Sequence, residues 1–310
     1  MRIFFMGTSS FAVPSLRALL ASGHEVVGVV TQPDRPAGRG RQLRLSPVKE
    51  AALEAGVPIH QPERVRNEGF IVEVRRLSPD ALVVAAFGQI IPKAILDIPK
   101  FGGVNVHASL LPKYRGAAPV HHALMGGETH TGVTSMLMDP GLDTGPILLQ
   151  REVEINPDEN EGMLEARLAE VGAGLLMETF DRLERGEVTP VPQDDSLASY
   201  APSVKREECE VNWEEDAVTI ANRVRGCTPR PGAYTYWQGV PLKVWACRAV
   251  ECAPSSGRPG EVLEVEPEGI IVRAGKGGIL LTEVQPENRK RMPAPDFARG
   301  QRIGKGAVLK

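Results

Sequence analysis

The feature that most constrains this sequence is the alternation of short apolar runs with amphipathic segments through its first half. The segments between the runs carry apolar residues at a helical spacing, and residues 46–56 also have the start and stop signals of a helix in Ser46, Pro47 and Gly56. Alternation of this kind predicts a Rossmann-like α/β fold, with a doubly wound, mostly parallel sheet. The clearest strand candidates are residues 3–6, 26–30, 81–87 and 104–109.

The sequence changes character near residue 188. Residues 188–206 contain three prolines and no periodicity, which is typical of a linker. One helical stretch follows near 214–226, and the later apolar runs are short and broken by Gly and Pro, as in the hairpin predicted over 270–284. We therefore expect a smaller OB-like antiparallel β-barrel after the α/β domain. The predicted division is a domain over 1–189, a linker over 190–207 and the barrel over 208–310.

Composition excludes several classes of protein. The chain of 310 residues is 42% hydrophobic and 24% charged, as in an ordinary globular protein. It has no run of about eighteen apolar residues, so we expect no membrane span. The N-terminal MRIFFMGTSS predicts a buried strand rather than a signal peptide. Four cysteines without a C-x-x-C pair disfavour a disulfide framework, and we expect a cytoplasmic protein.

Common nucleotide and metal motifs are absent from the sequence. Gly7-Thr8-Ser9 follows the first strand, but neither a dinucleotide-binding nor a P-loop glycine pattern continues from it. The chain has no H-E-x-x-H motif, and the three histidines His121, His122 and His130 lack an acid or a thiolate at ligand spacing. We therefore predict no bound metal.

Residues 101–149 contain the most informative chemistry. Asn105 and His107 lie two apart on a predicted strand, so their side chains share one face. Asp143 lies in a seven-residue loop with two glycines and two prolines, which fix the backbone and aim one carboxylate. An amide, an imidazole and a carboxylate can together stabilise an oxyanion and move a proton. Ser109 has no evident base–acid partners and no cysteine is near, so direct group transfer is favoured over an acyl-enzyme. These patterns do not name a substrate.

Three motifs resemble the 10-formyltetrahydrofolate-dependent formyltransferases: NVHASLLP at 105–112, YRGAAP at 114–119 and DPGLDTG at 139–145. The resemblance covers nearly the whole chain. It implies catalytic roles for Asn105, His107 and Asp143, 10-formyltetrahydrofolate as formyl donor and co-substrate, and a monomeric protein. The folate-binding residues that it implies are Ser109, Leu110, Leu111 and Pro112, with Phe87, Gly88, Gln89 and Ile90 in the pterin-pocket loop.

A further resemblance concerns the acceptor. The insertion TQPDRPAGRG at 31–40 is similar to the loop with which family members that formylate methionyl initiator tRNA grip its acceptor end. Residues 224–234 and 240–245 resemble the C-terminal domain of those members. The implied reaction is formylation of the α-amino group of methionyl initiator tRNA, for translation initiation. The implied tRNA contacts are Arg35, Arg39, Arg41 and Arg44, of which Arg39 and Arg41 are preferred, together with the basic end of the barrel.

The sequence is compatible with more than one role for Asp143 and with more than one function. Asn105 is expected to donate to the oxyanion and His107 to donate or carry a proton, while Asp143 either holds the imidazole charged or accepts the amine proton through water. The alternatives for function are a formyltransferase for a purine precursor or a nucleotide-sugar amine, a non-catalytic RNA-binding protein on a decayed enzyme fold, and a folate-independent deformylase. The arginine loop and the additional C-terminal domain favour tRNA.

Overall fold

The computed structural model describes residues 1–37, 42–253 and 257–310. These described residues form two compact units. In them, no helix combines the length and the apolar character that crossing a membrane requires. The first unit comprises 1–119, 130–154 and 165–201, and the second comprises 120–129, 155–164 and 202–310.

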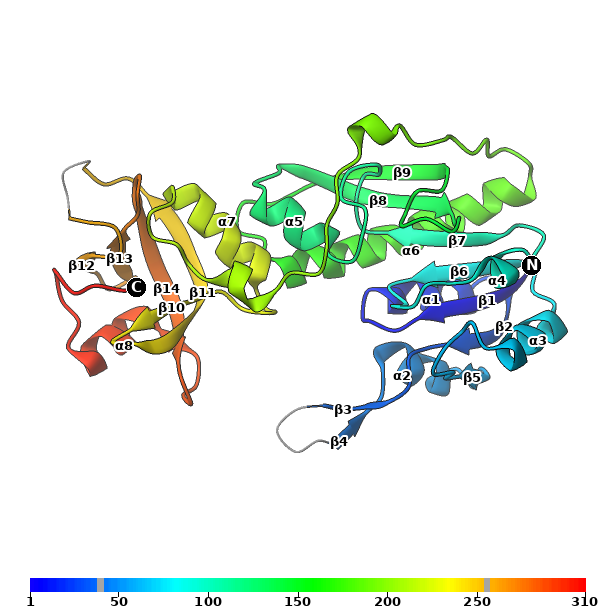
Figure 1. Ribbon diagram of the computed structural model, residues 1–310, viewed down its shortest axis with the longest axis horizontal. Coiled ribbons are helices and arrows are strands. Elements are labelled where there is room, and N and C mark those ends of the chain that lie inside the picture. The colour runs from blue at the N-terminus through cyan, green and yellow to red at the C-terminus, as the bar shows by residue number, and fades with distance from the viewer. Residues whose placement is uncertain (38–41, 254–256) are drawn as a thin grey trace. The chain divides into compact units, whose positions relative to one another are not determined.

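Within its described residues, the first unit is built on a seven-stranded sheet with the order β5-β2-β1-β6-β7-β8-β9 (Figure 1). The strands from β5 to β7 pair in parallel, and β8 and β9 add antiparallel strands at one edge. The predicted mostly parallel sheet is confirmed. The strand bounds are β1 (Arg2–Gly7), β2 (Glu25–Val30), β5 (Ile59–His60), β6 (Ala81–Ala85), β7 (Gly103–His107), β8 (His130–Leu137) and β9 (Ile147–Glu154).

The strand order places a topological switch point beside β1, since β1 pairs with β2 on one side and β6 on the other. Ligands of such sheets bind at the carboxyl ends of the strands near this point. All five residues of β6 are buried, as expected for an interior strand with both faces covered.

Helix α2 of the first unit follows the predicted signals closely. The Ser46 hydroxyl accepts from the Lys49 amide and Pro47 occupies the first turn, which confirms the predicted start of α2. Gly172 of α6 packs on β7, because an added Cβ there would lie 2.8 Å from a methyl group of Val106. This close packing supports the strand that carries the site. The helices of this unit are α1 (Ala12–Leu20), α2 (Pro47–Glu54), α3 (Glu68–Leu77), α4 (Lys93–Leu96) and most of α6 (Glu161–Glu184), whereas all but the first residue of α5 (Pro119–Met125) belongs to the second unit.

The described residues of the second unit form an antiparallel sheet with the order β10-β11-β14-β13-β12, and β15 also pairs with β14. This curled half-barrel confirms the predicted C-terminal fold. Asp216 caps α7 by accepting from the Val218 amide, whereas α8 was not predicted. The bounds are α7 (Ala217–Cys227), β10 (Tyr234–Trp237), β11 (Val240–Val250), β12 (Val262–Val265), β13 (Ile270–Arg273), β14 (Gly278–Pro286), β15 (Met292–Pro293) and α8 (Ala294–Gln301).

The insertion after β2 has a structure that its Gly- and Pro-rich sequence did not predict. Strand β3 (Arg35–Ala37) pairs antiparallel with β4 (Gln42–Arg44), so the described ends of the insertion form a ribbon. Asp34 at its base receives hydrogen bonds from Lys49 at 2.5 Å and Gln61 at 2.9 Å. These two bonds, with that of Lys49 the stronger, lower the pKa of the Asp34 carboxyl. The base of the ribbon is therefore fixed to α2.

Candidate active site

Strand β7 presents the two polar side chains that the sequence singled out. Asn105 and His107 are 8% and 6% exposed, and their strand lies between β6 and β8. Because side chains alternate along a strand, both point to the same face. Buried polar groups need hydrogen-bond partners, and each of these has one or more.

The His107 ring is oriented by a backbone carbonyl. Its Nε2 lies 2.9 Å from the carbonyl oxygen of Tyr114. A carbonyl can only accept, so Nε2 carries the hydrogen and donates it. The other nitrogen, Nδ1, lies 3.7 Å from Oδ2 of Asp143. Nδ1 is therefore the ring atom through which His107 can exchange a proton with the carboxylate or with a reacting group.

Asp143 reaches the strand from the loop between β8 and β9. Its Oδ2 accepts from the Gly116 amide at 2.8 Å, and its Oδ1 lies 3.4 Å from Nδ2 of Asn105. Its φ of +53° lies in the left-handed region, which non-glycine residues adopt at a cost. The loop folds so tightly that a Cβ at Gly145 would lie 1.8 Å from the Leu137 carbonyl oxygen. The loop thus aims one carboxylate at both β7 side chains.

The structure therefore brings the three predicted side chains together within one unit. A carbonyl carbon attacked beside them would develop negative charge on oxygen, for which Asn105 offers a neutral N–H donor. His107 and Asp143 offer an acid–base pair for the proton that the nucleophile must lose. This arrangement suits transfer of an acyl-type group to an amine without a covalent enzyme intermediate.

Residues 109–112 follow β7 directly, and their backbone is fixed from β8. Thr134 donates to the Ser109 carbonyl at 2.6 Å and accepts from the Leu111 amide at 3.1 Å. The Ser109 hydroxyl donates within the turn, to the Lys113 carbonyl at 2.7 Å. Leu110 packs over Gly132 of β8, where an added Cβ would lie 2.5 Å from it. Ser109 thus has a structural hydrogen bond, and the backbone of the segment is held in place.

The loop Phe87–Ile90 follows β6, next to the switch point. Its Phe87 carbonyl accepts from the Thr8 hydroxyl at 2.9 Å and from the Gln32 side chain at 3.3 Å, which ties the loop to the ends of β1 and β2. Gly88 has a φ of +83°. Gln89 accepts from the Val65 amide at 3.0 Å, and the Ile90 side chain is 87% exposed. Ile90 is thus the apolar side chain of this loop that a ligand could still cover.

The predicted tRNA contacts are only partly within the described residues. Arg35 and Arg44 lie opposite each other in the β3–β4 register, and both are exposed. Arg39 and Arg41 lie outside the described residues. Two exposed guanidinium groups at one end of a ribbon can bind an anionic partner.

Sequence reasoning missed two residues that support the site. Arg115, in the motif at 114–119, is 2% exposed, although arginine is normally a surface residue. Gln193, in the segment expected to be a linker, donates to the carbonyl oxygens of Asp143 at 2.8 Å and Gly145 at 2.7 Å. The motif containing Arg115 could have flagged it, whereas nothing in the sequence around Gln193 could have indicated its partners.

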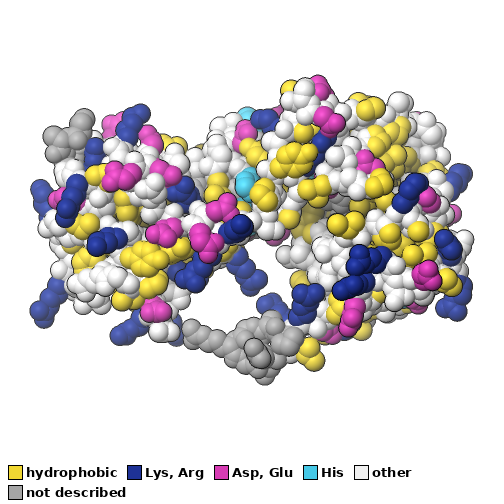
Figure 2. All heavy atoms as spheres, in the orientation of Figure 1, with side chains coloured by type: hydrophobic (Ala, Val, Ile, Leu, Met, Phe, Trp, Pro, Cys, Tyr) yellow, Lys and Arg dark blue, Asp and Glu magenta, His cyan; other side chains and the backbone are white. Residues whose placement is uncertain are grey.

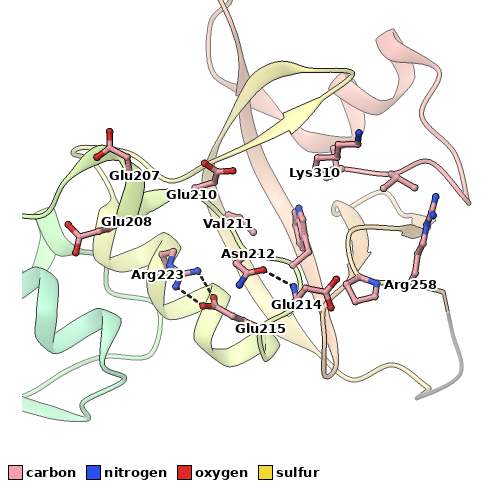
Figure 3. Close-up of a pocket in the computed structure, with 14 residues that line it drawn as sticks. Glu207, Glu208, Glu210, Val211, Asn212, Glu214, Glu215, Arg223, Arg258 and Lys310 are labelled. Atoms are coloured by element: carbon pink, nitrogen blue, oxygen red, sulfur yellow. Dashed lines mark hydrogen bonds and ion pairs between the residues drawn. The ribbon is translucent and has the colours of Figure 1, made fainter.

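The second unit contains a cavity of about 650 Å³, shown in Figure 3. Five of the described residues that line it are glutamates, and Arg223 pairs with Glu215. This excess of negative charge does not suit the carboxylates of a folate or the phosphates of RNA. Among the residues that the structure describes, no group of three or more His, Cys, Asp or Glu side chains could hold a metal ion.

Comparisons with known proteins agree with this chemistry. Residues 1–180 match the family "Formyl transferase", and residues 203–302 match "Formyl transferase, C-terminal domain". The methionyl-tRNA formyltransferase of Citrifermentans bemidjiense is 52% identical over 309 residues, which cover 100% of this chain and 96% of the relative. That of Syntrophus aciditrophicus is 51% identical, with coverage of 99% and 98%.

Solved structures share the fold at lower identity. WlaRD, described as a sugar 3N-formyl transferase in the presence of dTDP and 5-N-formyl-THF, has a TM-score of 0.67 at 19% identity and covers 94% of this chain and 99% of its own. HypX from Aquifex aeolicus has a TM-score of 0.66 at 20% identity and covers 99% of this chain and 48% of its own. The chain therefore belongs to the formyl transferase family, among the methionyl-tRNA formyltransferases.

Proposed function

We propose that this chain transfers the formyl group of 10-formyltetrahydrofolate to the α-amino group of methionine on initiator tRNA. The observation that carries the proposal is the convergence of Asn105, His107 and Asp143 around one point at the end of β7. The names of relatives about half identical over their full length support the choice of donor and acceptor. We also infer a cytoplasmic enzyme, because charged tRNA is used in translation in the cytoplasm. The family resemblance supports the further inference that it is monomeric.

In the proposed mechanism, the neutral α-amine attacks the formyl carbon. A free α-amine has a pKa of about 7.7–8.0, and the adjacent ester lowers it, so a neutral fraction exists near pH 7. Asn105 donates to the oxyanion of the tetrahedral adduct. The amine then loses a proton toward His107 and Asp143, the bond from the formyl carbon to N10 breaks, and N10 takes up a proton.

We assign Asp143 to the charged partner of the His107 imidazole. The 3.7 Å between Nδ1 and Oδ2 is an ion-pair distance rather than a hydrogen bond. The Nε2 atom is already engaged by the Tyr114 carbonyl, so a proton arriving on the ring must enter at Nδ1, beside the carboxylate. Asp143 then stabilises the cation that forms on the ring during transfer.

For the donor, we propose that two loops at one sheet edge hold the folate. Residues 87–90 follow β6 and residues 109–112 follow β7, and these strands are parallel neighbours. Their carboxyl ends therefore open at the same edge, where ligands of such sheets bind. Because internal hydrogen bonds hold both loops in place, their backbone can line a planar heterocycle without rearranging.

For the acceptor, we propose contacts from both units. Arg35, Arg39, Arg41 and Arg44 on the insertion would contact the acceptor end. Residues 208–310, after a linker over 190–207, would form the tRNA-contacting domain, and Lys and Arg side chains stand out from the surface of this unit in Figure 2. On it, two cations lie near the Trp245 ring. The distance to the ring centre is 4.5 Å from Cζ of Arg291 and 5.5 Å from Nζ of Lys243. An aromatic ring flanked by cations suits RNA, whose phosphates and bases both find partners there.

One assay tests the proposal and its alternatives. The chain is incubated with 10-formyltetrahydrofolate and methionine-charged initiator tRNA, and formyl-methionyl-tRNA and free formate are measured. We expect formyl-methionine in the same amount as the tetrahydrofolate formed. Formate without formyl-methionine would identify a hydrolase, and tRNA binding without any product would identify a binding protein. Formylation of a sugar or purine amine in preference to methionyl-tRNA would show that the acceptor is this amine and not tRNA.

A further inference from the structure

Gln193 connects the loop that carries Asp143 to the segment that follows α6. Its side-chain amide donates to the carbonyl of Asp143 at 2.8 Å and to that of Gly145 at 2.7 Å. One amide group thus uses both of its hydrogens on two carbonyls of a single turn. Asp143 has a left-handed φ of +53°, so the turn needs contacts of this kind to persist.

Arg115 holds Gln193 from the other side. Oε1 of Gln193 accepts from Nε and from a terminal nitrogen of Arg115, at 3.0 and 2.8 Å. Burial works against the charge on Arg115, but hydrogen bonds with Asp195 and Tyr200 outweigh it and raise the pKa of the guanidinium above its usual value. A buried charge persists only when it is paired and hydrogen-bonded, so the partners of Arg115 are held firmly against it.

The residues on both sides of Arg115 contact the catalytic groups directly. The Tyr114 carbonyl accepts from His107 at 2.9 Å, and the Gly116 amide donates to Asp143 at 2.8 Å. The backbone of Arg115 itself bonds to the returning segment: its amide donates to the Ser199 carbonyl at 2.8 Å, and its carbonyl accepts from the Ala201 amide at 2.7 Å. The segment 193–201 therefore fixes the backbone that orients both catalytic side chains.

We propose that Gln193 is a positioning residue, which Arg115 orients and which holds the Asp143 loop so that the carboxylate faces His107. The inference rests on the proposed function only in that Asp143 acts in the reaction. It makes the segment 193–201 part of the active-site support rather than a passive connection. Gln193 acts on the reaction through its hydrogen bonds to the carbonyls of Asp143 and Gly145.

The test compares Gln193→Leu, which removes the donor, with Gln193→Glu, which keeps an acceptor for Arg115 but cannot donate to the carbonyls when ionised. Each variant is made alone and combined with Asp143→Asn in the full-length chain. The control is Glu54→Gln, because the Glu54 carboxylate is exposed and pairs with Arg17 of α1, apart from the Asp143 loop. Turnover, the two KM values and the His107 ring signal in an NMR spectrum are measured, with thermal melting to check folding.

We expect both Gln193 variants to lower kcat about 10–100-fold, the loss typical of a small misplacement of a catalytic group. The KM for folate and for tRNA should change less than about threefold, and Glu54→Gln should stay near wild type. In the Asp143→Asn background, a Gln193 substitution should cost nothing further, because the group it positions is already lost. The His107 ring signal should move in the direction that Asp143→Asn moves it.

Two results would overturn the inference: an equal loss of kcat in both backgrounds, or a His107 signal that stays at its wild-type position while Asp143→Asn shifts it. If Gln193→Leu does not fold, Gln193→Glu decides, since its pairing with Arg115 remains. If the wild-type chain makes no formyl-methionine, the proposed function fails, and the NMR comparison still decides whether Gln193 positions Asp143.

Discussion

Replacing Asn105 by Asp tests the geometry of the site most sharply, because the amide nitrogen lies 3.4 Å from Oδ1 of Asp143. The change removes an oxyanion donor, which alone costs about 10²–10³ in rate. It also sets two carboxylates face to face. At 3.4 Å and an effective dielectric constant of about 20, their repulsion is about 5 kcal/mol. A repulsion of this size delays the loss of the second proton by about 3.5 pH units, so the two carboxylates would share one proton up to about pH 7.

This reasoning predicts a pH dependence that distinguishes two variants. Below about pH 7, the shared proton restores a hydrogen-bond donor, so kcat of Asn105→Asp divided by the wild-type kcat at the same pH should rise as the pH falls from about 8.5 to 6. Asn105→Ala loses the donor without adding a charge, and its kcat should follow the wild-type profile at a lower level. The assay is single-turnover formylation with tRNA and folate saturating at each pH. Equal profiles for the two variants would refute the proposed contact between Asn105 and Asp143.

Three further outcomes are expected. Gly145→Ala should lower the free energy of unfolding by about 1–3 kcal/mol in urea titrations and reduce kcat, because the added Cβ would collide with the Leu137 carbonyl. The control is Gly300→Ala, because a Cβ at Gly300 would meet nothing within 4 Å. Trp245→Ala should weaken tRNA binding by about 1–3 kcal/mol in filter-binding assays while leaving the folate KM unchanged. Arg44→Ala should raise the KM for tRNA and make tRNA binding less dependent on salt concentration. An unchanged KM for tRNA would show that Arg44 of the β3–β4 ribbon does not contact tRNA.

The sequence was sufficient for those parts of the site that depend on local patterns. The period-two spacing put Asn105 and His107 on one face, and the glycines and prolines around Asp143 indicated a loop that aims a carboxylate. Both features were found where they were expected. The helix signals around Ser46 also predicted α2 correctly. In each case the information lies within a few residues of the feature.

The features that sequence reasoning missed depend on distant partners or on very short elements. Strands β3 and β4 have three residues each, too few for an alternating pattern. Helix α8 has eight residues that include proline and glycine, which mask its apolar face. Gln193 finds its partners 50 residues away at Asp143 and 78 residues away at Arg115, and no local pattern encodes such a pairing.

The carbonyl of Tyr114, which orients the His107 ring, has a consequence for how this site can vary. Every amino acid supplies a carbonyl, so the group that fixes the imidazole leaves no signature in the side chain at position 114. What the position does require is a φ near +62°, which glycine and asparagine adopt readily and β-branched residues do not. In a library of substitutions at position 114, active clones should therefore be enriched in residues that adopt this backbone conformation, with β-branched residues depleted.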